Sequence, residues 1–138
     1  MNTQQKLTGA RYIADHLTRN HAWGTMDCCT MFLGYHDAVW GKEKSKDVVG
    51  KYADKGSAMR FYKRMKLTWR QWLFMNGYEK HEGKLAEGDI AVLDHKLFPT
   101  VYIYHNGTFW TMSEDRDMLS VDSKAMKSHE NVTVWRHK

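Results

Sequence analysis

Residues 23–41 read WGTMDCCTMFLGYHDAVWG, and this stretch predicts a buried helix that begins at the only two cysteines of the chain. Asp27 stands directly before the cysteines, where its side chain can accept hydrogen bonds from the first backbone amides of a helix. Gly41 follows the last apolar residue, as glycine often does at a helix C-terminus. Between them, one apolar stripe recurs at helical spacing: Cys28, Phe32, Tyr35 and Val39. We therefore predict a helix with both thiols in its first turn.

The two adjacent thiols leave two interpretations open. Consecutive Cα atoms lie about 3.8 Å apart, closer than the roughly 4.4–6.8 Å that a disulfide spans, and a structural zinc site usually needs four ligands. We therefore expect neither a disulfide nor a metal or cofactor site. Either the cysteines are small buried apolar residues, or the positive end of the helix dipole favours the thiolate and makes one of them a nucleophile.

Length and composition predict one folded domain over residues 1–138. Hydrophobic residues make up 42% of the chain and aromatic residues 13%, which argues for a packed core and against a disordered tail. The first residues, MNTQQKLTGARYIADHL, lack the basic and apolar regions of a signal peptide. No apolar run approaches the roughly 20 residues that span a bilayer. We therefore expect the chain to fold in a cytoplasm and to have no membrane partner.

Apolar spacing is helical in the part of the chain before Gly83. The first helix is expected to have Thr3 as its cap. A third helix is expected to begin at Ser57, and Thr68 is expected to cap a fourth helix that ends at Asn76-Gly77. The expected apolar stripe of the first helix consists of Leu7, Ala10, Ile13 and Leu17.

After Gly83 the chain turns to short segments rich in β-forming residues. Asn106-Gly107 separates two of them and is a strong signal for a two-residue hairpin. The expected strands are GDIAVLD, TVYIYH, TFWTM, MLSV and NVTVWR, with a short SKAMKSH helix before the last. Helices first and strands second predict an α+β fold, in which N-terminal helices pack on a C-terminal antiparallel sheet.

The positive charge of the chain is concentrated in one segment. The formal net charge is +5, and residues 42–66 alone hold nine basic and three acidic residues, which gives +6. Such a segment is either a solvated surface or an electrostatic footprint for nucleic acid or an anionic wall polymer. Nucleic acid is not favoured, although it stays open, because the chain has no RNP-like motif, zinc-finger spacing or glycine-rich phosphate loop.

Two stretches carry a resemblance to a known family. WGTMDCCTMF at 23–32 and GDIAVLDHKLFPTVYIYHNGTFWTM at 88–112 resemble the NlpC/p60 group of papain-like cysteine peptidases. In that group a DC pair begins a helix, a GD pair leads a strand, and the catalytic histidine begins the next strand. The resemblance extends through residues 50–64 and 118–136 to a phage-encoded branch found among tail-assembly genes. It implies an NlpC/p60-like fold.

The resemblance assigns roles to individual residues. Cys28 matches the nucleophile because it directly follows Asp27, which becomes the helix cap beside it. Gly88 and Asp89 match the GD pair. TVYIY aligns with the family pattern HVGIY and places Thr100 at the position of the histidine. The next polar position of the triad falls near Thr111, in the strand after the hairpin. A threonine hydroxyl cannot take a proton from a thiol near neutral pH, so the usual dyad is broken.

Another of the eight histidines would have to replace the missing base. His95 is the first candidate, because it lies in the loop between the first two expected strands and close to Thr100. His21 precedes the DC pair and could approach the thiol from the helix side. His105 lies five residues after Thr100, and the two-residue period of a strand turns it to the opposite face. For each of them an ordinary surface or core role is the alternative.

Two functions follow from the resemblance. In one, the protein is a phage tail-assembly or virion protein that keeps the fold without catalysis, with virion or tail proteins as partners. In the other, it is a cysteine peptidase or amidase that cleaves peptidoglycan stem peptides with Cys28. Thr100 in place of histidine favours the structural protein, which is therefore the expected function. The retained DC pair supports the enzyme as the alternative. Either function places the protein in a phage virion or in the host cytoplasm.

Overall fold

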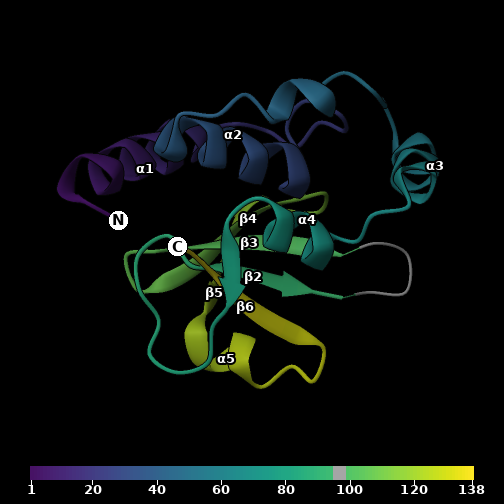
Figure 1. The fold of residues 1–138 in the computed structure, drawn as a ribbon. Coiled ribbons are helices and arrows are strands. Elements are labelled where there is room, and N and C mark those ends of the chain that lie inside the picture. The colour runs from purple at the N-terminus through teal and green to yellow at the C-terminus, as the bar shows by residue number, and fades with distance from the viewer. Residues whose placement is uncertain (95–98) are drawn as a thin grey trace.

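The helices of the chain lie mainly on one side of a six-stranded antiparallel sheet (Figure 1), in a computed structural model that describes residues 1–94 and 99–138. The strand order is β1-β6-β2-β3-β4-β5. The helical elements are α1 (Thr3–His16), α2 (Cys28–Trp40), the 3₁₀ turn η1 (Ser45–Asp47), α3 (Lys55–Met65), α4 (Trp69–Met75) and α5 (Ser123–Lys127). The strands are β1 (Tyr78–Lys80), β2 (Ile90–Leu93), β3 (Thr100–His105), β4 (Thr108–Ser113), β5 (Asp117–Asp122) and β6 (Val132–His137). This is the predicted α+β architecture.

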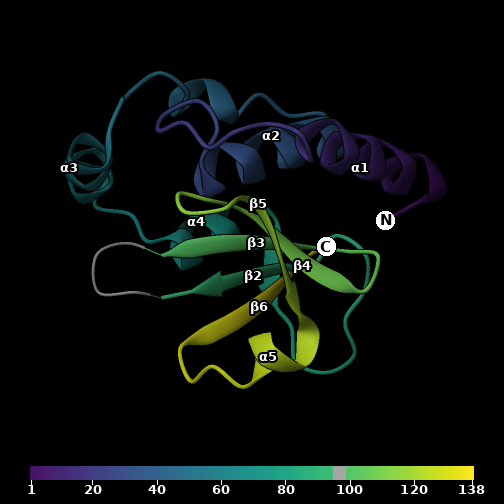
Figure 2. The ribbon, with the colours of Figure 1, turned by 180° about the vertical axis from the view of Figure 1, so that it is seen from behind.

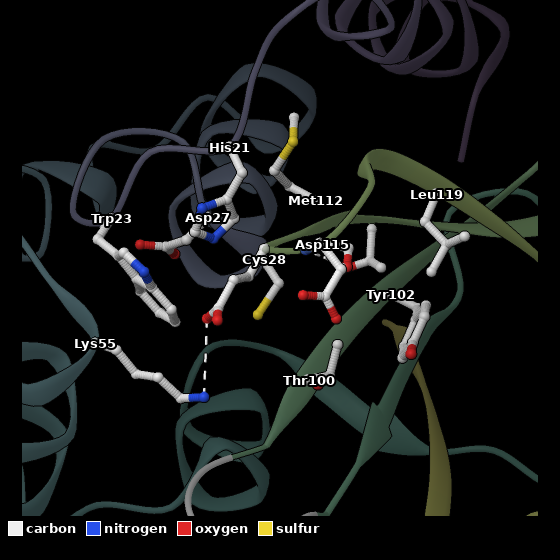
Figure 3. Close-up of a pocket in the computed structure, with 13 residues that line it drawn as sticks. His21, Trp23, Asp27, Cys28, Lys55, Thr100, Tyr102, Met112, Asp115 and Leu119 are labelled. Atoms are coloured by element: carbon white, nitrogen blue, oxygen red, sulfur yellow. Dashed lines mark hydrogen bonds and ion pairs between the residues drawn. The ribbon is translucent and has the colours of Figure 1, made fainter.

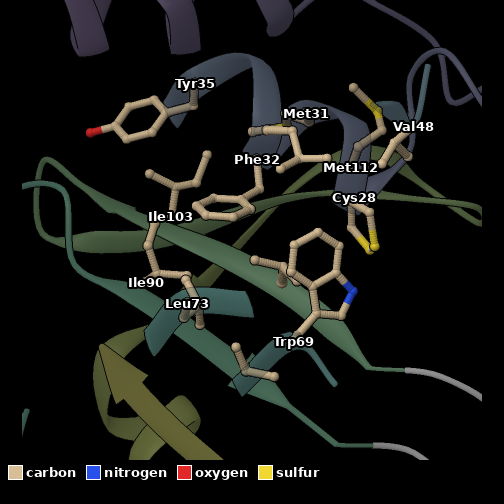
Figure 4. Close-up of a cluster of buried hydrophobic side chains, with 14 of the residues drawn as sticks. Cys28, Met31, Phe32, Tyr35, Val48, Trp69, Leu73, Ile90, Ile103 and Met112 are labelled. Carbon is tan, nitrogen blue, oxygen red and sulfur yellow. The ribbon is translucent and has the colours of Figure 1, made fainter. Parts of the chain in front are cut away.

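The sheet has a buried face on each side. Helices α1 and α2 cover one face, and α5 lies against the other, as the view from behind also shows (Figure 2). On the helix side, Phe32 of α2 lies among the side chains of Ile90, Ile103, Leu73 and Trp69 (Figure 4). On the other side, Met126 of α5 packs in a second cluster with Ala91, Leu93, Tyr102 and Phe109. No helix in the described parts of the chain is long and apolar enough to cross a membrane.

The β3–β4 hairpin confirms the strongest local prediction. Asn106 and Gly107 both have positive φ angles, of 51° and 87°, as a two-residue type I′ turn requires. His105 consequently pairs with Thr108, and the ladder continues along both strands. This register fixes which side chains of β3 and β4 share a face.

Asp89, the aspartate of the GD pair, ties the start of β2 to β6. Its carboxylate is buried and accepts two hydrogen bonds from the Arg136 guanidinium, each 2.8 Å long. It also accepts one from the Ala86 amide, at 2.8 Å. The GD pair therefore has a structural role, because it clamps the last strand into the middle of the sheet.

Two glycine–tyrosine contacts set the packing of α1 on α2. A Cβ added to Gly9 would lie 2.9 Å from the Tyr35 ring, and one added to Gly34 would lie 2.3 Å from the Tyr12 hydroxyl oxygen. Each glycine therefore gives the other helix room for an aromatic ring. The Tyr12 hydroxyl also donates a 2.8 Å hydrogen bond to the carbonyl of Met31.

These contacts correct the apolar stripe predicted for the first helix. Leu7 and Leu17 are about half exposed, at 49% and 48%, while Gly9 and Ile13 are buried. The close approach at Gly9 turns the helix so that the tyrosine contacts, and not the two leucines, meet α2. The cap is corrected as well, because Asn2 caps α1 through the Gln5 amide.

Two other boundaries differ from the prediction. Helix α3 begins at Lys55 with Asp54 as its cap, because the Asp54 carboxylate accepts the Ser57 amide at 2.7 Å. The segment after α4 was expected to stay in the helical half, but Tyr78–Lys80 forms β1 and pairs with β6. Its partner lies more than fifty residues later in the chain, so local spacing gives no signal for it.

His36 of α2 is buried among aromatic rings and hydrogen-bonds the Tyr78 hydroxyl at 2.8 Å. Burial, with smaller contributions from the charges of His137, Lys42 and Lys44, lowers the pKa of His36 to about 4 in spite of an opposite effect of Asp37. Between that value and the ordinary 6.5, the unfolded chain binds a proton at this position that the folded chain does not.

We therefore expect the free energy of unfolding to fall as the pH drops from about 6.5 toward 4. The His36 share of this loss is about 2–3 kcal/mol, at roughly 1.4 kcal/mol for each unit of pKa difference. Urea unfolding of the wild type and His36→Gln at pH 7 and pH 4.5 measures it as the difference between their losses. His129→Gln, at an exposed histidine, is the control. An equal loss in wild type and His36→Gln would contradict the prediction.

Candidate functional site

A cleft of about 450 Å³ lies at the N-terminal end of α2, where the helix layer meets strands β3 to β5 (Figure 3). Its helix-side wall comes from the loop before α2 and from the first residues of the helix. The residues that matter for its chemistry are His21, Trp23, Asp27, Cys28 and Lys55 on that side, and Thr100, Tyr102, Thr111, Glu114 and Asp115 on the sheet side. The sequence-predicted residues Asp27, Cys28 and Thr100 thus line one cleft.

The two cysteines occupy different surroundings, as expected. Cys28 lines the cleft and is 9% exposed, whereas Cys29 is 1% exposed and belongs to the core. Their sulfur atoms still lie 3.8 Å apart. The hydrogen bond with Cys28, together with burial, raises the pKa of the Cys29 thiol well above its ordinary value. Cys29 is therefore a neutral thiol that can donate to the Cys28 sulfur.

The Asp27 carboxylate is the structural centre of the helix start. Its Oδ1 accepts the amides of Cys29 and Thr30 at 3.0 and 2.9 Å, and its Oδ2 accepts the Gly24 amide at 2.9 Å and the Tyr52 hydroxyl at 2.7 Å. Four donors on one buried carboxylate leave no lone pair for proton transfer. Asp27 is therefore a positioning residue, and Tyr52 is a partner that sequence reasoning did not identify.

The loop before the helix folds back on itself. Ala22 and Met26 pair as an antiparallel bridge, with N···O distances of 2.9 and 2.7 Å. The turn between them depends on Gly24, which has φ 87° and would place a Cβ 1.8 Å from the Tyr52 carbonyl oxygen. His21 directly precedes the bridge and Asp27 directly follows it, so the turn brings both residues to the start of α2.

The first amide of the helix is left available. Cys29 and Thr30 donate to the Asp27 side chain, and the Met31 amide donates to the Asp27 carbonyl at 2.9 Å. Among the described residues, no acceptor lies within hydrogen-bonding distance of the Cys28 N–H. A backbone amide without a partner next to a thiol is the kind of donor that stabilises an oxyanion.

On the sheet side, both threonines of the resemblance lie at the cleft. Thr100 lines it from the first position of β3, and Thr111 of β4 donates its hydroxyl to the Val101 carbonyl at 2.8 Å. Tyr102, which packs in the second cluster on the α5 side, also lines the cleft; burial, and secondarily the nearby Cys28, raise its pKa. The sequence offered no reason to select Tyr102 beyond its two-residue spacing from Thr100.

The three histidine candidates differ in whether the structure brings them to the cleft. His95 lies outside the described residues. His105 bonds the Glu87 carboxylate and does not line the cleft. His21 does line it, and its backbone N–H donates to Asp117 Oδ1 at 2.8 Å. Within residues 1–94 and 99–138, His21 is the histidine that the structure brings to the cleft with Cys28.

Charged side chains border the cleft. Glu114 and Asp115 come from the turn between β4 and β5, and Lys55 of α3 lies 3.9 Å from Glu114 (dashed in Figure 3). Figure 3 shows the Cys28 sulfur with Trp23 and Lys55 on one side and with Thr100 and Tyr102 on the other. No group of three metal-ligating side chains comes together in the described parts of the chain.

A comparison with protein families gives a match over nearly the whole chain. Residues 2–135 match a family model with the description "Domain of unknown function (DUF6950)". The match includes α2 and most of β6, so it contains both walls of the cleft. No curated protein matches the chain.

The Asp27 carboxylate yields a stability prediction. We expect Asp27→Ala to lower the free energy of unfolding by about 3 kcal/mol, because it leaves several buried donors without an acceptor. Asp54→Ala, the matched change at the exposed cap of α3, should cost about 1 kcal/mol. Urea denaturation of both variants tests the order. Equal losses would show that the additional acceptor role of Asp27 contributes nothing.

Proposed function

The chain belongs to the DUF6950 family, and we propose that it is a cysteine hydrolase with an NlpC/p60-like fold that cleaves amide bonds in peptidoglycan stem peptides. The observation that carries this proposal is the position of Cys28. Its thiol lines a cleft, its residue begins α2, and its own N–H has no acceptor among the described residues. A nucleophile and an oxyanion donor thus belong to one residue.

The helix start supports thiol chemistry through electrostatics. The aligned peptide dipoles of α2 place roughly half a positive charge beside the Cys28 sulfur, which carries negative charge when it acts as a nucleophile. Cys29, held as a neutral thiol 3.8 Å away, can stabilise the same negative charge by donating its S–H. The Asp27 carboxylate already accepts four hydrogen bonds from the protein. It therefore has no acceptor site left for the substrate.

The substrate class comes from the resemblance to NlpC/p60 peptidases and from the form of the cleft. A stem peptide is an extended chain of amide bonds, and the cleft offers polar groups on both walls, with Lys55 on one side and Asp115 on the other. Thr100 at the histidine position means that the proton of Cys28 has to leave to a group other than a β3 side chain.

A second function keeps the fold and omits catalysis. In this proposal the protein is a phage tail-assembly or virion component, and Thr100 records the loss of the histidine. The neighbouring side chains of Phe74 and Met75 on α4 are each 69% exposed, and exposed apolar pairs of this kind favour contact with another protein. This feature supports a partner surface but names no partner.

Incubation with purified peptidoglycan separates the two functions. We expect the wild type to release stem-peptide fragments and Cys28→Ala to release none, because the variant lacks the nucleophile. Cys29→Ala keeps the nucleophile but removes the S–H that can donate to it, so this variant should still release fragments, at a lower rate than the wild type. Mass spectrometry of the soluble fraction identifies the cleaved bond. Equal inertness of wild type and Cys28→Ala, with copurification of phage tail or virion proteins, would contradict the hydrolase and support the structural component.

A further inference from the structure

We propose that His21 is the general base for Cys28, so that the histidine comes from the loop before the nucleophile and not from the sheet. This inference rests on the proposed role of Cys28 as a nucleophile. It differs from the arrangement implied by the resemblance, in which the histidine begins β3. The residue at that position is Thr100, and the structure brings His21 to the same cleft from the other side.

The backbone brings His21 to the cleft that Cys28 lines. His21 directly precedes the Ala22–Met26 bridge, and Asp27 and Cys28 directly follow it, so the turn returns the chain to the start of α2. Gly24 makes the turn possible and donates to the Asp27 carboxylate, which also caps the helix. One carboxylate therefore holds both the turn that carries the imidazole and the helix that carries the thiol.

Two further contacts fix the position of His21. Its N–H donates to the Asp117 carboxylate on β5 at 2.8 Å, which anchors the loop to the sheet. Its ring meets the Trp23 ring edge-on, with 4.8 Å between the ring centroids. The anchor to Asp117 uses the backbone, so substitution of the side chain leaves it in place.

The ring nitrogens of His21 are available, unlike those of most other histidines. Among the described residues, no hydrogen-bond partner lies within reach of either His21 nitrogen. Five other histidines each bond a protein group through a ring nitrogen: His16, His36, His81, His105 and His137. A half-buried imidazole that lines the cleft with both nitrogens uncommitted is suited to exchange a proton with the thiol or with a substrate.

Carboxylates outnumber cations around the cleft. Asp117 bonds the His21 backbone, and Asp27, Glu114 and Asp115 line the cleft. Lys55 opposes them but is paired with Glu114. The walls therefore hold more negative than positive charge at the place where a proton would pass from the thiol to the imidazole.

The reaction balances with water as the second substrate. A His21 nitrogen takes the proton of Cys28, and the sulfur forms a bond to the amide carbonyl carbon. The C–N bond breaks as His21 gives that proton to the leaving amine, which leaves a thioester. Water then adds to the thioester while His21 accepts its proton, the C–S bond breaks, and the proton returns to the sulfur. The products are a carboxylic acid, an amine and the regenerated thiol.

Alkylation by iodoacetamide tests the pair without any knowledge of the substrate. The parent is the full chain with Cys29→Ala, in which Cys28 is the single thiol and displaces iodide. At pH 6 we expect His21→Ala and His21→Gln to react about tenfold more slowly than the parent, because the imidazole no longer accepts the thiol proton. At pH 9 the rates should converge. His129→Ala, at an exposed histidine, should react like the parent. Equal rates at pH 6 in the parent and both His21 variants would overturn the proposal.

The same variants separate this inference from the proposed function. On peptidoglycan, the pair predicts roughly a hundredfold loss of fragment release in His21→Ala, within the range of general-base effects. If the wild type releases no fragments but the alkylation difference is present, the pairing stands and the hydrolase proposal fails. If the wild type cleaves and His21→Ala cleaves equally well, the hydrolase stands and His21 is not its base. Far-UV circular dichroism of each variant shows that the comparison is made between folded proteins.

Discussion

The buried carboxylate of Asp27 is the constraint on which the cleft depends. It joins three pieces of chain, which are the first turn of α2, the Gly24 turn and Tyr52. A buried charge is costly unless donors surround it, and here four donors do. The same bonds that compensate the charge also fix the distance between the loop and the helix. Stability and site geometry therefore have a common origin in one side chain.

The structure gives the two cysteines different surroundings where the sequence left two interpretations open. Both belong to the core cluster, but Cys28 also lines the cleft, which Cys29 does not. Burial in the core fits the packing interpretation for Cys29, and Cys28 stays the candidate nucleophile. The two sulfur atoms lie 3.8 Å apart, so that Cys29 can donate a hydrogen bond to the sulfur at the cleft.

Local signals predicted most of the fold. The caps at Asp27 and Thr68 and the Asn106-Gly107 turn each depend on neighbouring residues, and the structure has all three as expected. The misses depend on distant partners. The face of α1 is set by Tyr35 of another helix, and β1 exists because β6 pairs with it. No periodicity within one segment can report either contact.

The residues of the candidate site also fall into those that local sequence predicted and those that depend on distant partners. Cys28 and Asp27 could be selected from the DC pair and the helix pattern, and Thr100 came from the resemblance; all three line the cleft. His95 was preferred because it is close to Thr100 in sequence, and it lies outside the described residues. His21 reaches the cleft through a turn whose geometry depends on Tyr52, a residue far along the chain. A spacing argument ranks histidines by their distance along the sequence, and it gives no signal for a turn of this kind.

The position of β6 has a consequence for how the protein folds during synthesis. This strand lies between β1 and β2, and Arg136 within it is the partner of Asp89. The ribosome makes residues 132–137 after every other strand, so β1 and β2 have no common neighbour until then. Until β6 is inserted, β2 presents an open edge of the kind that favours pairing with other chains. The nascent chain therefore completes its sheet late, when β6 inserts between β1 and β2. Until then the Asp89 carboxylate lacks Arg136, its partner in the folded protein.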